Sequence, residues 1–196
     1  FIILAVAIIL NSSTSKATQK TSGKDAYGND WSYDAATKTL TFTGEGKAGA
    51  DFIMDGHSDE PEWFDLHRET EKVVFSENIT EIGAGTCDGF TFTKIIELPQ
   101  TLEIIGELAF SSCVRLESVE FPNSLRVLGY DSFSGCYALK EIKLNVGLEI
   151  IDDGALSSNK FESVGIPSTV KKIGSSAFQA CDNLKKINLN EGLESI

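Results

Sequence analysis

The sequence has 196 residues, of which 41% are hydrophobic and 23% are charged. This composition is ordinary for a folded protein, and the length suits one good-sized domain. Acidic residues outnumber basic residues by 29 to 17, and the formal net charge is −12. A surface of this sign repels phosphate groups, which argues against nucleic acids and anionic lipid surfaces as partners.

The chain begins with consecutive apolar residues from Phe1 to Leu10. This run is too short to span a bilayer as a helix, which needs roughly twenty residues, but it matches the core of a signal peptide. We predict a truncated signal peptide at 1–17 and a polar linker at 18–24. The alternatives are a short buried segment or a clipped membrane anchor. Export predicts a secreted or cell-surface protein whose mature chain is not inserted in a membrane.

Residues 25–70 are predicted to form an N-terminal capping region with a β-hairpin. Apolar residues alternate with polar ones on two arms, which are joined by a turn at Asp34–Lys38. They are Trp31 and Tyr33 on the first arm, and Leu40 and Phe42 on the second. Together with Trp63 and Phe64, the hairpin can cover the first copy of the repeat array that follows, which would otherwise expose its core and backbone edge. A separate binding module is the alternative.

The sequence repeats itself from residue 71 to residue 196. One apolar position recurs at intervals of 23, 23, 23, 22 and 23 residues. It is occupied by Ile82, Ile105, Leu128, Ile151, Ile173 and Ile196. In the copy that is one residue shorter, Asn159 stands where other copies have cysteine. A single copy cannot bury its own apolar face, so the copies are predicted to stack.

Each copy contains three predicted parts. A triplet such as Ile-x-Leu alternates inward and outward side chains, as a short strand does. An Ile-Gly step suits a bend with positive φ, and Ala-Phe-x-x-Cys-x-x-Leu has the apolar spacing of one or two helical turns on the outer side. The strands should form a parallel ladder with about 4.8 Å between rungs. Its rungs are Val73–Phe75, Ile96–Leu98, Val119–Phe121, Ile142–Leu144, Val164–Ile166 and Ile187–Leu189.

The run Ile-Gly-x-x-Ala-Phe-x-x-Cys-x-x-Leu-x-x-Ile-x-Leu-Pro, as in Ile105 to Pro122 with its variants, closely resembles the BspA-like leucine-rich repeats. The resemblance covers residues 71–196. It implies a curved solenoid on an exported or surface-attached protein, and recognition or adhesion rather than catalysis. It transfers no binding residue, because family members share core residues and vary the exposed ones. We therefore expect an α/β repeat solenoid, a right-handed leucine-rich-repeat stack with short parallel strands on its concave face.

No motif in the sequence indicates a catalytic, cofactor-binding or metal site. The segment Asp51–Glu62 partly fits a calcium-binding loop, but Ile53 stands where an oxygen ligand belongs, so an acidic surface loop is expected. The two histidines, His57 and His67, match neither a zinc-binding helix nor a catalytic triad. We expect no enzyme activity and no cofactor.

The four cysteines are predicted to be free. Cys113, Cys136 and Cys181 share one inward column, and Cys87 lies in the phenylalanine column. Only Cys113 and Cys136 belong to adjacent rungs, where their Cβ atoms would lie about 4.8 Å apart, slightly beyond the usual disulfide range. A buried free cysteine acts as a small apolar residue.

The strand residues that point outward form two columns of varied chemistry, which we predict to bind a protein on the concave face. The candidate binding residues are Val74, Ile95, Glu97, Ser118, Glu120, Glu141, Lys143, Lys186 and Asn188. Val74 and Ile95 are expected to form a small apolar patch bordered by Glu97 and Glu120. The alternative function is a structural spacer that presents a distal domain. The pattern indicates neither the identity of the protein ligand nor an oligomeric state.

Overall fold

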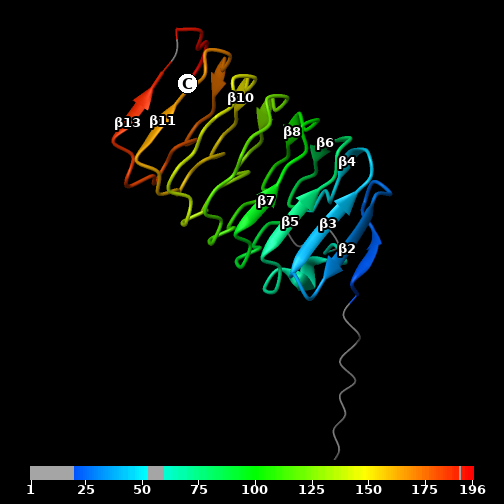
Figure 1. Ribbon diagram of the computed structural model, residues 1–196. Helices are drawn as coiled ribbons and strands as arrows, with labels where there is room; N and C mark the ends of the chain where they lie inside the picture. The colour runs from blue at the N-terminus through cyan, green and yellow to red at the C-terminus, as the bar shows by residue number, and fades with distance from the viewer. Residues whose placement is uncertain (1–19, 53–59, 190) are drawn as a thin grey trace, which may run out of the picture.

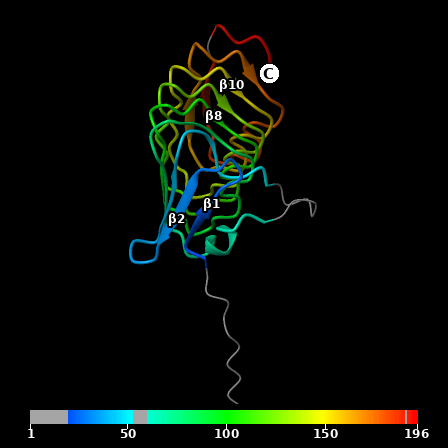
Figure 2. The ribbon, with the colours of Figure 1, turned by 90° about the vertical axis from the view of Figure 1, so that its right-hand side faces the viewer.

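The computed structural model describes residues 20–52, 60–189 and 191–196. The predicted signal peptide at 1–17 lies outside the described residues. From β5 onward the copies of the repeat follow one another along a stack (Figure 1). In the view turned by 90°, the copies lie one behind another, with β1 and β2 at one end (Figure 2).

The first sheet joins the N-terminal hairpin to the repeats. Its strands, in spatial order, are β1 (Ser22–Lys24), β2 (Asp30–Asp34), β3 (Thr39–Thr43), β5 (Lys72–Phe75) and β7 (Ile95–Glu97). The antiparallel pair of β2 and β3 is the predicted hairpin, in which Trp31 lies opposite Phe42. β3 then pairs in parallel with β5, so that Phe42 lies opposite Phe75.

Aromatic rings fill the space between this hairpin and the first repeat. The Phe42 ring stacks on Phe75 with 4.9 Å between ring centroids, and it meets Trp63 edge-on at 5.0 Å. The indole N–H of Trp63 donates a hydrogen bond of 2.9 Å to the carbonyl oxygen of Thr86. The buried hairpin face therefore continues the apolar core of the repeats without a break.

A second parallel sheet runs along the other side of the stack. Its strands, in chain order, are β4 (Gly46–Ala48), β6 (Ile79–Ile82), β8 (Ile104–Ile105), β9 (Val127–Leu128), β10 (Ile150–Ile151) and β12 (Lys172–Ile173). From β6 onward, each strand ends just before the Ile-Gly glycine or, in β10, just before Asp152, which replaces it. The apolar residue of this step thus closes a second strand that the apolar pattern did not predict, and a turn begins directly after the glycine.

The glycines of the Ile-Gly steps have a steric role rather than the predicted positive φ. Gly83, Gly106, Gly129 and Gly174 do not have positive φ. A Cβ atom at Gly106 would lie 2.7 Å from the carbonyl oxygen of Ile82, and one at Gly83 would lie 1.9 Å from that of Ala50. Successive copies approach so closely at this position that only a residue without a side chain fits easily.

The outer segments are turns, and the prediction of helical turns is wrong. Alternate amides donate to the next copy, as when the N–H groups of Leu108 and Phe110 bond to the carbonyl oxygens of Tyr130 and Ser132 at 2.8 and 2.9 Å. The amide of Ala109 closes a local turn onto Gly106 instead. A helix would require all of these amides for bonds within one segment.

Positive φ angles also interrupt each outer segment at two positions. In one copy they fall at Leu108 (φ 55°) and Ser112 (φ 57°), and in the next at Asp131 and Gly135. In the described residues the only helix is the short 3₁₀ element η1 (Phe64–Leu66). No helix in the described part of the chain is long and apolar enough to cross a membrane.

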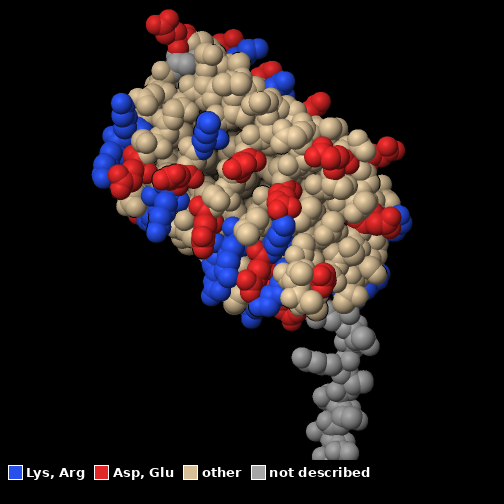
Figure 3. Space-filling view, in the orientation of Figure 1, with Lys and Arg blue, Asp and Glu red and all other residues tan. Residues whose placement is uncertain are grey.

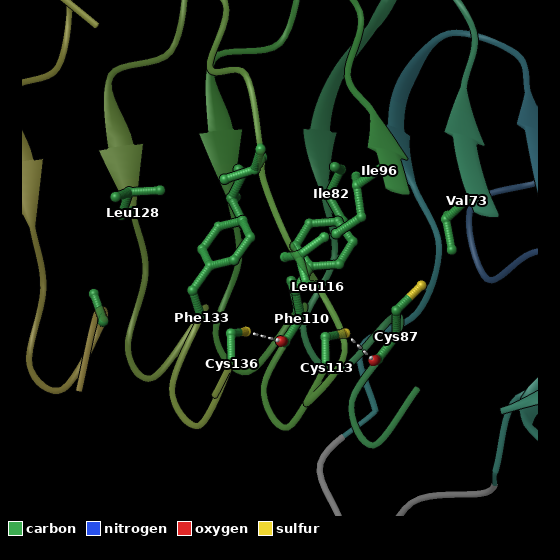
Figure 4. Close-up of a cluster of buried hydrophobic side chains, with 14 of the residues drawn as sticks. Val73, Ile82, Cys87, Ile96, Phe110, Cys113, Leu116, Leu128, Phe133 and Cys136 are labelled. Atoms are coloured by element: carbon green, nitrogen blue, oxygen red, sulfur yellow. Dashed lines mark hydrogen bonds between the residues drawn. The ribbon is translucent and has the colours of Figure 1, made fainter. Parts of the chain in front are cut away.

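The core consists of columns of like residues that run along the stack. Phe110 and Phe133 are fully buried and stack with 5.2 Å between ring centroids (Figure 4). In the shorter copy, Leu156 occupies the phenylalanine column and Phe161 the neighbouring leucine column, and both are fully buried. This exchange keeps the total core volume nearly constant where one residue is missing.

The cysteine column links each copy to the one before it. The Cys113 thiol donates to the carbonyl oxygen of Cys87 at 3.5 Å, and the Cys136 thiol donates to that of Phe110 at 3.4 Å (Figure 4). Where Asn159 replaces cysteine, its amide donates to the carbonyl oxygen of Phe133 at 2.9 Å. All four cysteines are free and buried, as predicted, and burial raises the pKa of the Cys136 thiol to about 12.

The predicted ladder of six rungs is interrupted in the middle. β11 (Ser163–Gly165) pairs with β13 (Lys186–Asn188), but residues 118–121 and 141–144 form no strands. Phe121 stands edge-on to Phe133 at 5.5 Å, where the rungs on either side have the smaller Leu98 and Leu144. Ring size alone does not prevent pairing, because Phe75 at the same position lies in β5, which pairs with both β3 and β7.

The phenylalanine column should dominate the stability of the stack. Phe110→Ala and Phe133→Ala should each lower the free energy of unfolding by about 3–5 kcal/mol, because each removes a fully buried ring. Phe178 is only half-buried, so Phe178→Ala should cost about 2 kcal/mol. Urea midpoints measured for the three variants check this order. A Phe110→Ala midpoint equal to that of the parent would contradict the inward placement of this column.

The close approach at the Ile-Gly step can be tested with one pair of glycines. Gly106→Ala should lower the free energy of unfolding by about 1–3 kcal/mol, because its Cβ meets the backbone of the previous copy. Gly165→Ala is the matched control, since nothing lies within 4 Å of a Cβ there. Equal urea midpoints for the two variants would show that the steric account of Gly106 is wrong.

Candidate functional site

We call the outward side of β3, β5, β7, residues 118–121, residues 141–144, β11 and β13 the front face. The structure places all the candidate binding residues on it, because side chains of these short extended segments alternate between core and solvent. Val74 is half-buried, and the others are exposed. They are Ile95, Glu97, Ser118, Glu120, Glu141, Lys143, Lys186 and Asn188.

An ion pair divides the predicted apolar patch. Lys72 lies opposite Ile95, and Val74 lies opposite Glu97, in the pairing of β5 with β7. These four residues form a square in which Val74 and Ile95 lie on one diagonal. Lys72 and Glu97 lie on the other diagonal, where the Lys72 ammonium is 2.6 Å from the Glu97 carboxylate. Ile95, which is 52% exposed, is therefore an isolated apolar side chain beside an ion pair.

A hollow of about 380 Å³ adjoins Ile95 on the side of the next rung. Among its lining residues are Ile95, Glu97, Ser118 and Glu120. Four of the candidate residues thus come together around one depression. It lies between β7 and the unpaired segment 118–121, at the start of the interrupted part of the front face.

A second hollow, of about 500 Å³, lies between the two segments that form no strands. Glu120 and Lys143 from the candidate set contribute to its lining, together with Val146. The Val146 side chain is 71% exposed, and sequence reasoning missed it. The sequence does distinguish Val146, because the equivalent positions of the neighbouring copies hold the polar residues Asn123 and Ser168.

A third hollow, of about 740 Å³, is lined by Tyr137, Lys140, Glu141, Lys160 and Glu162, among others. Tyr137 is 55% exposed and was also missed, although it stands where the shorter copy has Lys160. Of the candidate residues only Glu141 contributes to this hollow. Lys186 and Asn188 lie further along the face on β13, and Val74 lies outside all three hollows.

Charges in the middle of the front face are unpaired, in contrast to those at its ends. Lys38 and Lys94 both reach the Glu71 carboxylate, and the hydrogen bond from Lys38 is the largest cause that lowers the Glu71 pKa to about 2. Within the part of the chain that the structure describes, no ion pair involves Glu120 or Lys143. Acidic and basic side chains lie intermingled on the surface, most densely towards its lower left edge (Figure 3). The central charges remain available to a partner.

The polar groups elsewhere are arranged for structure more than for proton transfer. Burial, and a hydrogen bond with Asp51, raise the pKa of Tyr27 to about 12, far from the range of a general base at neutral pH. The His67 ring stacks on Phe64, and its Nδ1 lies 2.7 Å from the carbonyl oxygen of Phe64. Most of the calcium-like loop, including His57, falls in residues 53–59, outside the described residues. Among the described residues, no cluster of three His, Cys, Asp or Glu side chains could hold a metal ion.

Parallel strands of period 22 or 23, a shared core and turn-like outer segments define this chain as a leucine-rich-repeat protein. The profile of the BspA type leucine rich repeat region, with six copies, matches residues 60–185. The chain belongs to the BspA-type leucine-rich-repeat family. No curated protein matches the sequence.

Solved structures of bacterial leucine-rich-repeat proteins share this fold. The TpLRR protein of T. pallidum is 27% identical, with a TM-score of 0.64 over 88% of this chain and 84% of that chain. A leucine-rich repeat protein of Bacteroides ovatus is 26% identical, with a TM-score of 0.59 over 82% of this chain and 39% of that chain. A leucine-rich cell surface protein of Faecalibacterium prausnitzii, at 20% identity and a TM-score of 0.53, shows the fold alone. That match covers 86% of this chain and 54% of that chain.

Proposed function

We propose that the chain is an extracellular or cell-surface module that binds a protein, in the manner of an adhesion molecule, without catalysing a reaction. The partner lies on the front face, over the hollows between β7 and β11. Family membership supports recognition as the role, and the apolar run from Phe1 to Leu10 supports export.

The N-terminal region acts as a cap in this proposal. The hairpin of β2 and β3 pairs with the first repeat strand, β5, and brings Trp31 and Phe42 to the core. Residues 25–70 are thereby a lid for residues 71–196 rather than a separate module. The winding of the stack is right-handed, as almost all connections between parallel neighbouring strands are.

A contrast between inward and outward columns carries the proposal. Inward positions hold the same few apolar residue types in every copy, whereas the two outward columns vary from apolar to acidic to basic. Exposed Ile95 and Val146 lie beside unpaired charges at Glu120 and Lys143. Apolar anchors with a charged rim, next to depressions that can receive partner side chains, are the usual composition of a protein-binding surface.

Binding should depend on the first two hollows. A partner would first be captured by the purified chain from extracellular-matrix and cell-surface proteins and identified. Ile95→Arg and Glu120→Lys should then each weaken its binding at least about tenfold, because they change an exposed anchor and an unpaired charge. Thermal stability should change by less than about 1 kcal/mol, since both side chains point into solvent.

Tyr130→Arg is the matched control, because Tyr130 is 46% exposed but lies on the outer turns. Its affinity for the same partner should equal that of the parent, as measured by calorimetry or surface plasmon resonance. Unchanged affinity in both front-face variants would place the binding site elsewhere. Loss of binding in Tyr130→Arg alone would place it on the outer turns.

A further inference from the structure

Charges alternate in sign along one repeat position at the edge of the front face. This position lies two residues before the first residue of each predicted rung. The series begins at Lys38 in the turn of the hairpin, whose carbonyl oxygen accepts a hydrogen bond from the amide of Glu71. We call this series the first charge ladder. Its members are Lys38, Glu71, Lys94, Glu117, Lys140, Glu162 and Lys185.

The structure places neighbouring members of this ladder next to each other. The amide of Glu71 donates to the carbonyl oxygen of Lys38, and that of Lys94 donates to Glu71, both at 2.9 Å. Glu71 binds both lysines through its side chain, at 2.5 and 2.9 Å. At the other end, the Lys185 ammonium reaches Glu162 at 3.1 Å. Ion pairs thus join the ladder at both ends, and among the described residues none joins Lys94, Glu117, Lys140 and Glu162, which alternate in sign by their position in successive copies.

A second charge ladder alternates in the same way at the edge of the second sheet. It consists of Glu103, Arg126, Glu149, Lys171 and Glu194. Every consecutive pair is joined by a backbone hydrogen bond of 2.8 or 2.9 Å, in which the amide of the later residue donates to the carbonyl oxygen of the earlier one. The Arg126 guanidinium approaches Glu149 at 3.9 Å.

The two ladders run in opposite phase. A copy with lysine in the first ladder has glutamate in the second, as in Lys94 with Glu103, and the next copy reverses the order, as in Glu117 with Arg126. Alternation is not general for exposed columns, because Glu97 and Glu120 are consecutive members of an outward column with the same charge. The repeat unit of charge is therefore two copies long, whereas the repeat unit of the core is one.

We propose that the two ladders are a charge code by which each copy recognises its correct neighbour, and that the code excludes stacks in which one copy is skipped. The apolar columns cannot exclude this error, because Phe110 and Phe133 or Cys113 and Cys136 are interchangeable in the core. A skipped copy would bring Lys94 onto Lys140 and Glu103 onto Glu149, placing like charges together at both edges. Repulsion between like charges within the ladders raises the free energy of the wrong stack, whereas the ladders of the correct stack contain no such pair.

The first test exchanges charges in the full-length chain. The double variant Lys94→Glu/Glu117→Lys keeps the net charge but places like charges beside Glu71 and Lys140. Its Tm should fall by about 2–6 °C at low salt. In 1 M NaCl the difference from the parent should shrink to under about 1 °C, because salt screens exposed charges.

The control for this test inverts the whole first ladder, which restores alternation with more substitutions. Its seven changes are K38E, E71K, K94E, E117K, K140E, E162K and K185E. At low salt its Tm should lie closer to the parent than that of the double variant. A Tm for the inverted ladder at or below that of the double variant would overturn the charge code, because the effect would then follow the number of substitutions.

The second test builds the skipped stack directly, by deletion of residues 117–139. One chain carries this deletion alone, so that Lys94 meets Lys140 in the first ladder and Glu103 meets Glu149 in the second. A second chain carries the same deletion and six substitutions that restore alternating charges in both ladders after the deletion, without a change in length or net charge. They are K140E, E149K, E162K, K171E, K185E and E194K. The corrected chain should have the higher Tm at low salt and refold with less aggregate. Equal Tm values, or equal failure to fold, would overturn the proposal. This inference does not depend on the proposed binding function.

Discussion

Direct contact between successive backbone turns is the constraint on which the rest of this structure depends. At the Ile-Gly step a Cβ atom on Gly106 would lie 2.7 Å from the carbonyl oxygen of Ile82. The outer turns are bonded to each other as closely, since the amide of Phe110 donates to Ser132 at 2.9 Å. Two sides of each copy are thus fixed by its neighbours, and the apolar residues between them must fall into columns.

This constraint separates positions that serve the fold from positions that are free to serve recognition. An inward residue such as Phe133 meets the same column in both neighbours, so its size is restricted. An outward residue such as Ile95 meets solvent and can vary without loss of packing. The front face is hollowed beside residues 118–121 and 141–144, because depressions form where strands do not pair. The edge positions have a third role, since their charges distinguish one copy from the next.

The sequence was sufficient to predict the period, the inward columns, the free cysteines and the outward placement of the candidate residues. These features follow from local alternation of apolar and polar residues, which is visible in each copy. The outer turns could not be predicted from spacing alone, because Ala-Phe-x-x-Cys fits a helix until the bond from Phe110 to Ser132 in the next copy is known. The hollows lie beside residues 118–121 and 141–144, which form no strands although their apolar alternation matches that of the paired rungs. Val146 was visible in the sequence as a single apolar residue in a polar column.

Amide hydrogen exchange measures the bonding between copies most directly. The buried amides of Phe110 and Phe133 donate to the next copy at 2.9 Å, whereas the amide of Ile142 on the front face has no acceptor among the described residues. The account predicts that the two phenylalanine amides exchange only through global unfolding, and that Ile142 exchanges at least about 100-fold faster. Exchange of Phe110 and Phe133 as fast as that of Ile142 would contradict the stack of directly bonded turns.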